Sequence, residues 1–121
     1  MSTSEIATVL AWHDALNAHD IDTLLSLSSD DVELATADGA SQGVAALREW
    51  AEKFDATLLP GRMFVHHGVV VVQQQLGNTW IATSFRVVQD QAVASVFRHP
   101  NLEEALRTTG LTTADEVAAS S

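Results

Sequence analysis

The sequence predicts a small α+β domain, in which N-terminal helices pack on the concave face of a cone-shaped, curved antiparallel β-sheet. Two observations predict this class. Helix-like and strand-like apolar spacings alternate in the first half of the chain, and the second half is strand-like almost to its end. Short separators divide that second half, as in an antiparallel meander. Helices gathered on one face of a curved sheet leave room for a pocket.

The first half of the chain is predicted to hold three helices and one strand. Helical apolar spacing covers residues 4–18, and a short second helix follows the capping residue Asp20. Residues 30–39, "DDVELATADG", then alternate as a strand that ends in an Asp-Gly turn. Helical spacing returns over residues 43–54.

The second half is predicted to form four strands and a terminal helix. The stretches "TLLPGRMFVH", "VVVVQQQL", "TWIATSFRVV" and "AVASVFRH" are separated by two or three turn-forming residues. Pro60-Gly61 inside the first stretch indicates a bulge. Asn101 and Glu104 match a capping box, and Gly110 is a natural helix stop, so a helix should lie between them.

Length and composition describe one acidic domain, spanning 1–121, with residues 112–121 predicted as a loose tail. The formal charge of −10, from 16 acidic and 6 basic residues, argues against binding to nucleic acid or an anionic membrane. The absence of cysteine excludes disulfides and thiolate chemistry. The first residues lack a signal-peptide pattern, so a cytoplasmic location is expected.

Three stretches together resemble a known family. The chain's "ALNAHDIDTLLSLSSDDVEL", "GVAALREW" and "EEALRTTGL" are similar to the SnoaL-like and ketosteroid-isomerase-like branch of the nuclear transport factor 2-like superfamily. The resemblance covers nearly the whole chain and implies that superfamily's cystatin-like roll. The superfamily hosts isomerases, cyclases, dehydratases, epoxide hydrolases and non-catalytic binding domains, so the fold alone does not imply an activity.

The functional positions of ketosteroid isomerase are all changed in this chain. The resemblance places the catalytic Asp at Thr36, the oxyanion-donating Tyr at Trp12 and the second, acidic donor at Thr83. A threonine is no base near neutral pH, and the chain has no tyrosine. Classical ketosteroid isomerase activity is therefore not expected.

These positions still predict the wall of a pocket. Strand alternation places Thr36 on the inward face, and a two-residue turn at Gly77-Asn78 would set Thr83 opposite Val72 and Ile81 opposite Gln74. Such a wall, apolar with a few polar groups, suits a small hydrophobic molecule. The predicted ligand-binding residues are Trp12, Thr36, Val72, Gln74, Ile81, Thr83, Phe85 and Arg98.

The adjacent histidines His66 and His67 are predicted to form a bend and not a metal site. Neighbouring strand residues point to opposite faces, so the two rings could not share one inward site. His67 followed by Gly68 is typical of a two-residue hairpin turn. No HxH or HExxH spacing occurs, and we expect neither a metal nor a cofactor.

Two other histidines are the candidate catalytic residues. His13 lies on the apolar stripe of the first helix, where it is either a core histidine with one hydrogen bond or a pocket acid or base. A leucine at position 13 is expected to be tolerated. His99 ends the last strand, where the resemblance to polyketide cyclases implies an acid, although a rim position explains it equally well. Arg98 faces inward opposite Thr83 only if the preceding turn has two residues.

Two functions remain open at this point. The first is a pocket protein that binds a hydrophobic, metabolite-sized ligand and transfers a proton without a cofactor, through His13 or His99, in an isomerisation, cyclisation or dehydration. The second is a non-catalytic binding or dimerisation module of the same fold. An imidazole or carboxylate that projects into an open cavity would favour the first, so the sequence leaves open whether the chain is an enzyme.

The outer face of the sheet is predicted to bind a second copy of the chain. It should carry Val69, Val71, Trp80 and Arg86 but no acidic residue, despite the charge of −10. An acid-free, partly apolar face in so acidic a chain is typical of a partner-binding surface. Relatives commonly pair through this face, so we expect a two-fold homodimer. Alternatively, the terminal helix folds back over this face within one chain.

Overall fold

The structure is a computed structural model that describes residues 3–36, 39–88 and 92–117. Within these ranges the elements follow the predicted order, with a short additional strand and a 3-10 turn near the C-terminus. In chain order the elements are α1 (Thr3–Asn17), α2 (Ile21–Ser26), β1 (Ser28–Thr36), β2 (Gly39–Gln42), α3 (Val44–Lys53), β3 (Leu58–His66), β4 (Val69–Leu76), β5 (Thr79–Val87), β6 (Val93–His99), α4 (Leu102–Thr109) and η1 (Thr113–Asp115).

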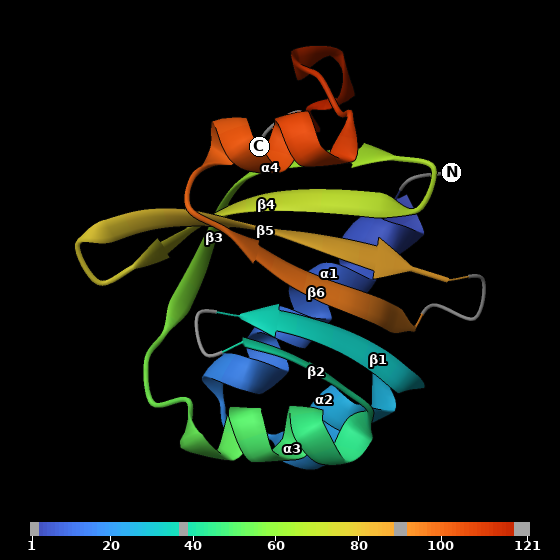
Figure 1. The fold of residues 1–121 in the computed structure, drawn as a ribbon, viewed down its shortest axis with the longest axis vertical. Coiled ribbons are helices and arrows are strands. Elements are labelled where there is room, and N and C mark those ends of the chain that lie inside the picture. The colour runs from blue at the N-terminus through green and yellow to red at the C-terminus, as the bar shows by residue number, and fades with distance from the viewer. Residues whose placement is uncertain (1–2, 37–38, 89–91, 118–121) are drawn as a thin grey trace.

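The strands of the described chain form one curved, unclosed sheet in the order β2-β1-β6-β5-β4-β3 (Figure 1). Strands β3 to β6 form the predicted antiparallel meander. Strand β1 lies parallel to β6, and β2 pairs antiparallel with β1 at the edge. The parallel pair joins the two halves of the chain into a single sheet.

The predicted pairing of β4 with β5 is confirmed. Thr83 lies opposite Val72, and Ile81 lies opposite Gln74. A two-residue turn fixes this register, since Gly77 supplies the positive φ of 61° that such a turn requires. The register places alternate residues of both strands on the concave face.

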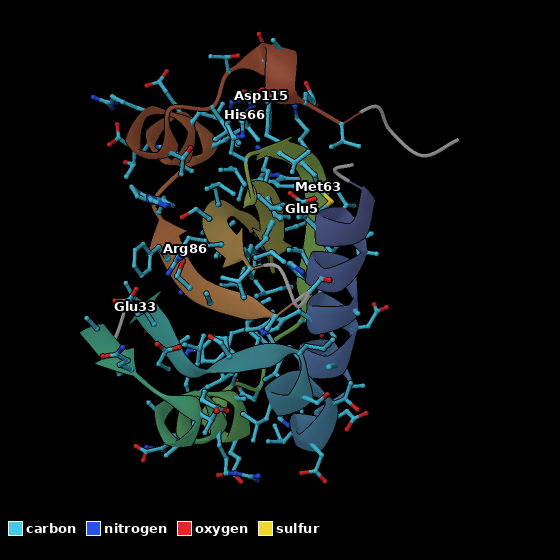
Figure 2. The ribbon with its side chains drawn as sticks, turned by 90° about the vertical axis from the view of Figure 1, so that its right-hand side faces the viewer. Glu5, Glu33, Met63, His66, Arg86 and Asp115 are labelled. Atoms are coloured by element: carbon cyan, nitrogen blue, oxygen red, sulfur yellow. The ribbon has the colours of Figure 1, made fainter. Side chains whose placement is uncertain are left out.

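The His66-His67 pair marks the predicted hairpin between β3 and β4. His66 pairs with Val69 at the end of the ladder, and His67 and Gly68 have φ angles of 48° and 80°. Positive φ at both central residues is typical of a type I′ turn. His66 is exposed on the outer side, where its Nδ1 lies 3.4 Å from Asp115 Oδ1 (Figure 2).

Local capping fixes the ends of two helices as predicted. The Asp20 carboxylate accepts a hydrogen bond from the Thr23 N–H and opens α2. The Asn101 side chain accepts from the Glu104 N–H at 2.9 Å and opens α4, which is one half of the predicted capping box, while the Glu104 carboxylate pairs with Arg107. Gly110 ends α4 in the left-handed conformation, with φ 80°. The predicted bulge in β3 is also present, as a shift of its register after Pro60.

The sheet has a hydrophobic core on each face. Helix α1 lies against the concave face with α2 and α3, whereas α4 lies on the opposite face (Figures 1 and 2). The concave core includes Val9, Trp12, Leu16, Leu24, Leu47, Val70, Val72 and Phe85. The smaller outer core contains Phe64, Val71, Ala82, Ala105 and Leu111.

Two expectations about the outer face need correction. Val71 was expected to be exposed to solvent in a monomer, but α4 buries it completely within the same chain. The predicted loose tail is docked as far as residue 117, since Glu116 pairs with Arg62 at 2.8 Å and Val117 N–H donates to Met63 O. Helix α4 packs on the outer face of the sheet because an amphipathic helix must bury its apolar residues. Residues 118–121 lie outside the described part.

Candidate ligand-binding site

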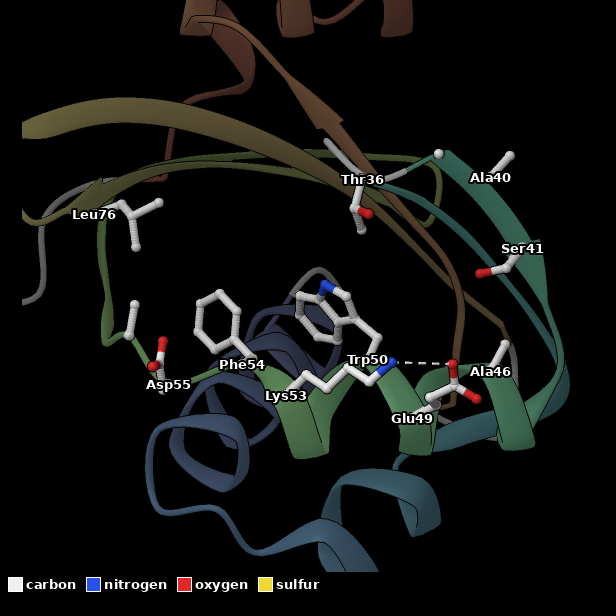
Figure 3. A pocket seen from close by; sticks show the side chains of 12 residues that line it. Thr36, Ala40, Ser41, Ala46, Glu49, Trp50, Lys53, Phe54, Asp55 and Leu76 are labelled. Carbon is white, nitrogen blue, oxygen red and sulfur yellow. Dashed lines mark hydrogen bonds and ion pairs between the residues drawn. The ribbon is translucent and has the colours of Figure 1, made fainter.

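A cavity of ≈ 630 Å³ opens between α3 and the sheet (Figure 3). We call this cavity the mouth. Helix α3 lines one side with Trp50 and with Phe54 just beyond its end, and β2 lines the other. Its rim carries Glu49, Lys53 and Asp55, and Lys53 Nζ lies 3.4 Å from Glu49 Oε1. The entrance is therefore polar although the wall behind it is aromatic.

A second cavity of ≈ 30 Å³, here called the floor, adjoins the mouth on its inner side. Both cavities are lined by Thr36, Trp50, Phe54 and Leu76, so together they form a funnel that narrows toward the core. The floor has about the volume of one water molecule in the liquid. It can admit only the tip of a ligand.

The floor brings together almost every predicted ligand-binding residue. It is lined by Trp12, Thr36, Trp50, Phe54, Leu58, Gln74, Leu76, Ile81, Thr83, Phe85, Val96 and Arg98. Val72 is the exception, since it is fully buried in β4 and does not line the cavity. Sequence reasoning missed Trp50 and Phe54, for which a large aromatic residue on the flank of an amphipathic helix was the available signal. That these residues bind a ligand stays a prediction.

Aromatic rings form the wall between funnel and core. Trp12 stacks on Trp50 with ring centroids 6.1 Å apart, and Trp50 lies against Phe54 at 5.1 Å. The Phe85 ring meets Trp12 edge-on at 5.3 Å. Such contacts add to burial and hold the rings in fixed orientations. The funnel therefore has a rigid apolar lining.

The indole N–H of Trp12 is directed away from the funnel. It donates to Ser28 Oγ at 3.2 Å, and that hydroxyl donates in turn to Leu24 O. A buried indole N–H needs an acceptor, and these contacts supply one within the protein. Trp12 thus has no indole hydrogen left for a ligand.

A buried chain of hydrogen bonds runs from α1 to β5. His13 Nδ1 lies 2.8 Å from Val9 O, and His13 Nε2 lies 2.8 Å from Gln74 Nε2. The Thr83 hydroxyl donates to Gln74 Oε1 at 2.7 Å. His13 and Gln74 are each 1% exposed, so no water replaces these partners. Every member of the chain is satisfied within the protein.

His13 lies behind the cavity wall and lines neither the mouth nor the floor. Burial lowers the pKa of His13 below its usual 6.5, against smaller opposing effects of the Val9 hydrogen bond and the charge of Asp14. His13 therefore fits the description of a neutral core histidine with two hydrogen bonds better than that of an acid or base in a pocket. The two-bond arrangement exceeds the single bond expected from the sequence.

Arg98 and His99 face opposite sides of β6. Arg98 lies opposite Thr83 and lines the floor, as one of the two sequence interpretations predicts. His99 lies opposite Ala82 on the outer face, with its Nε2 3.0 Å from Ser84 Oγ. Burial lowers the pKa of His99. The two candidate catalytic histidines are therefore separated by the sheet and cannot share a site.

Other classes of site find little support in the described ranges. Within residues 3–36, 39–88 and 92–117, no three His, Asp or Glu side chains come together as metal ligands would. No described helix is both long and apolar enough to cross a membrane. Among the described carboxylates, none forms an ion pair with Arg98.

The SnoaL-like domain family matches residues 9–101, which is most of the chain. The chain belongs to this family. The match covers every residue that lines the funnel, from Trp12 to Arg98. No curated protein sequence matches the chain.

Solved structures share the same fold at low identity. A candidate polyketide cyclase from Sinorhizobium meliloti is 19% identical over 77% of this chain and 94% of its own, with a TM-score of 0.70. An NTF2-like protein of unknown function from Cytophaga hutchinsonii is 15% identical over 84% and 94%, also at 0.70. A computationally designed 17-OHP binder is 14% identical over 83% and 95%, at 0.68. At these identities the likeness shows the NTF2-like fold alone.

Proposed function

We propose that this SnoaL-like domain binds a small, mostly apolar molecule in the funnel, with an oxygen-bearing end near Arg98. The mouth volume of ≈ 630 Å³ falls in the usual range for metabolite-sized ligands. The body of such a ligand would lie against Trp50 and Phe54 and its tip would enter the floor. The shared fold of the designed 17-OHP binder supports this use of the scaffold.

The single observation that carries this proposal is the composition of the floor. Its lining is aromatic and aliphatic apart from two threonines, Gln74 and Arg98. Few polar groups on an apolar wall orient a ligand without repelling it. Arg98 adds a permanent positive charge with several donors, which favours a carbonyl, carboxylate or sulfonate oxygen.

Binding without proton transfer by His13 is the favoured form of this function. A general base must reach the proton that it removes, directly or through one water. The Nε2 lone pair of His13 is already engaged with Gln74, and none of the described imidazoles or carboxylates lines the floor. The carboxylates of Glu49 and Asp55 lie only at the rim of the mouth. His99 lies on the other side of the sheet. Catalysis by His13 would require the concave core to rearrange, and His99 would have to reach the funnel across the sheet.

Two fluorescent probes test this proposal. Anilinonaphthalene sulfonate carries an anionic group, and phenylnaphthylamine has the same rings without it. We expect both to quench Trp12 and Trp50 in a Trp80→Phe background. Arg98→Gln should weaken sulfonate binding about tenfold, as expected for a lost charged hydrogen bond, and leave the neutral probe within about twofold.

The control is Arg86→Gln, because Arg86 is an exposed cation on the outer face of the neighbouring strand. It removes the same charge from the chain and should change neither probe. Absence of binding by both probes would exclude the funnel as a ligand site. Equal losses in the two arginine variants would mean that net charge, and not the floor, attracts the sulfonate.

A further inference from the structure

The buried chain of hydrogen bonds that ends at Thr83 has a fixed direction. Val9 O is a carbonyl and can only accept, so His13 Nδ1, 2.8 Å away, must carry the hydrogen. A neutral imidazole protonated at Nδ1 has only a lone pair at Nε2. The group that meets it is therefore the Gln74 amide nitrogen as donor, at 2.8 Å.

The fixed direction of the hydrogen bonds extends from Gln74 to the cavity. With its nitrogen on His13, Gln74 presents its carbonyl oxygen to Thr83, and that oxygen can only accept. The Thr83 hydroxyl hydrogen is thus committed to Gln74 at 2.7 Å. Since Thr83 lines the floor, the part of its hydroxyl left for a ligand is an oxygen lone pair.

We propose that the floor selects a ligand whose tip donates a hydrogen bond to Thr83, as an alcohol or phenol hydroxyl does. This inference rests on the proposed function, because it concerns the same funnel. Arg98, the Cα partner of Thr83, lines the same floor and supplies donors beside this acceptor. The ligand class is a mostly apolar molecule with a hydroxyl close to a carbonyl or carboxylate oxygen.

An ether or ketone oxygen at Thr83 needs a hydrogen-bond donor, whereas the Thr83 hydroxyl offers it only an acceptor. To bond it, Thr83 would have to turn its hydrogen toward the ligand and leave Gln74 Oε1 without a donor. Leaving a buried acceptor unpaired costs about as much as the new hydrogen bond contributes. Gln74 could regain a full set of partners only if His13 moved its hydrogen to Nε2. That change would leave the Nδ1 lone pair of His13 facing Val9 O.

A matched pair of small probes tests the inference. β-Naphthol can donate through its hydroxyl, whereas its methyl ether has the same rings and can only accept. At pH 7 both are neutral. Amide NMR titration of the intact protein should give β-naphthol an affinity about five- to tenfold higher than the ether, the fold-change that one hydrogen bond supplies.

Variants of Thr83 and Gln74 assign the preference to this chain of bonds. Thr83→Val keeps the shape but removes both the acceptor oxygen and the donor to Gln74 Oε1. The preference should disappear through loss of β-naphthol affinity, because the remaining acceptor, Gln74 Oε1, lies 2.7 Å from the position of the lost hydroxyl. Thr83→Ser should retain it. Gln74→Met frees the Thr83 hydrogen, and the preference should fall although Thr83 is still present. If Gln74→Met does not fold, the Thr83 pair still decides the matter.

A ligand-free measurement checks the direction itself. Long-range ¹H–¹⁵N spectra should show His13 as the neutral tautomer with its hydrogen on Nδ1. The Nε2-protonated tautomer, an ether bound as tightly as β-naphthol, or a preference that survives in Thr83→Val would each overturn the inference. These results differ from failure of the proposed function, in which neither these probes nor the fluorescent ones bind.

Discussion

The Nε2 atoms of His13 and Gln74 lie 2.8 Å apart, although 61 positions separate the two residues in sequence. The contact ties α1 to β4 in the middle of the concave core. The rings of Trp12 and Phe85 flank the imidazole, with centroids 6.1 and 5.4 Å away. In such an apolar site each polar atom needs a protein partner. The pair therefore fixes which groups of the concave core donate hydrogen bonds and which accept them, as well as how the core packs.

Gln74→Leu should lower the free energy of unfolding by about 1–3 kcal/mol, because it leaves the buried Nε2 of His13 without a donor. Urea denaturation followed by tryptophan fluorescence measures this loss. Gln73→Leu is the matched control, since Gln73 precedes Gln74 in β4 but faces outward beside Ala82. A similar loss in both variants would show that the substitution acts through the strand and not through the histidine.

His13→Leu should cost a similar about 1–3 kcal/mol, because the Gln74 amide then loses its acceptor. This outcome reverses the expectation from the sequence that leucine is tolerated at position 13. The double variant His13→Leu with Gln74→Leu should lose less than the sum of the two, since it leaves neither partner unpaired. Strict additivity of the two losses would contradict the hydrogen bond.

Stability should fall as pH drops from about 6.5 toward the folded-state pKa of His13. Burial lowers that pKa below its usual 6.5, so between the two values the unfolded chain binds more protons than the folded one. The contribution is complete above the unfolded pKa and decreases by at most about 1.4 kcal/mol per pH unit below it. Urea midpoints measured at several pH values would show the slope.

His99 acts in the same direction, because burial lowers its pKa as well. His99→Gln therefore serves as the reference in which the remaining slope belongs mainly to His13. Glu116 works in a separate range, since its hydrogen bond to Arg62 lowers the carboxyl pKa below its usual 4.5. A wild-type slope of zero between pH 7 and 5.5 would contradict a neutral buried His13.

Leu111→Ala should destabilise the protein by about 2 kcal/mol or more, because Leu111 completes the outer core under α4. Leu59→Ala removes the same atoms from a side chain that is 53% exposed and should cost little. Thermal or urea unfolding distinguishes the two. Equal effects would mean that α4 does not hold its position on the sheet in solution.

Local signals in the sequence predicted the elements and their register. The Gly77-Asn78 pair fixed which residues of β4 and β5 face the funnel, because a two-residue turn permits only one alternation. Asn101 and Gly110 marked the ends of α4 through capping, which involves only nearby backbone groups. Where the decisive interaction is local, the sequence is sufficient.

Non-local choices were not predictable in this way. Strand β2 is short and fully exposed, so it lacks the apolar alternation that reveals a strand. No tight turn connects β1 with β6, so the sequence holds no local signal for their parallel pairing. The helical stripe showed that His13 lies inside, but nothing in the sequence indicated that its partner would be Gln74. The proximity of two side chains from distant elements emerges only from the packed fold.

Helix α4 leaves part of the outer face uncovered. Trp80 remains 51% exposed there, while Val71 and Ala82 are buried beneath the helix. The two-fold homodimer through this face stays a prediction, with a smaller apolar contribution than the sequence alone implied. Since a dimer interface requires a well-packed apolar centre, Trp80 is the residue expected to supply it.

Trp80→Glu should then give a folded monomer at concentrations where the wild type is dimeric, because a carboxylate cannot be buried unpaired in the interface. Sedimentation velocity over a range of micromolar concentrations measures this. Leu10→Glu is the matched control, since Leu10 is 38% exposed on α1, on the opposite side of the sheet. A wild-type chain that sediments as a 13.0 kDa species at every concentration would exclude the dimer. Loss of the dimer in both variants would instead attribute it to net charge, which each substitution makes more negative.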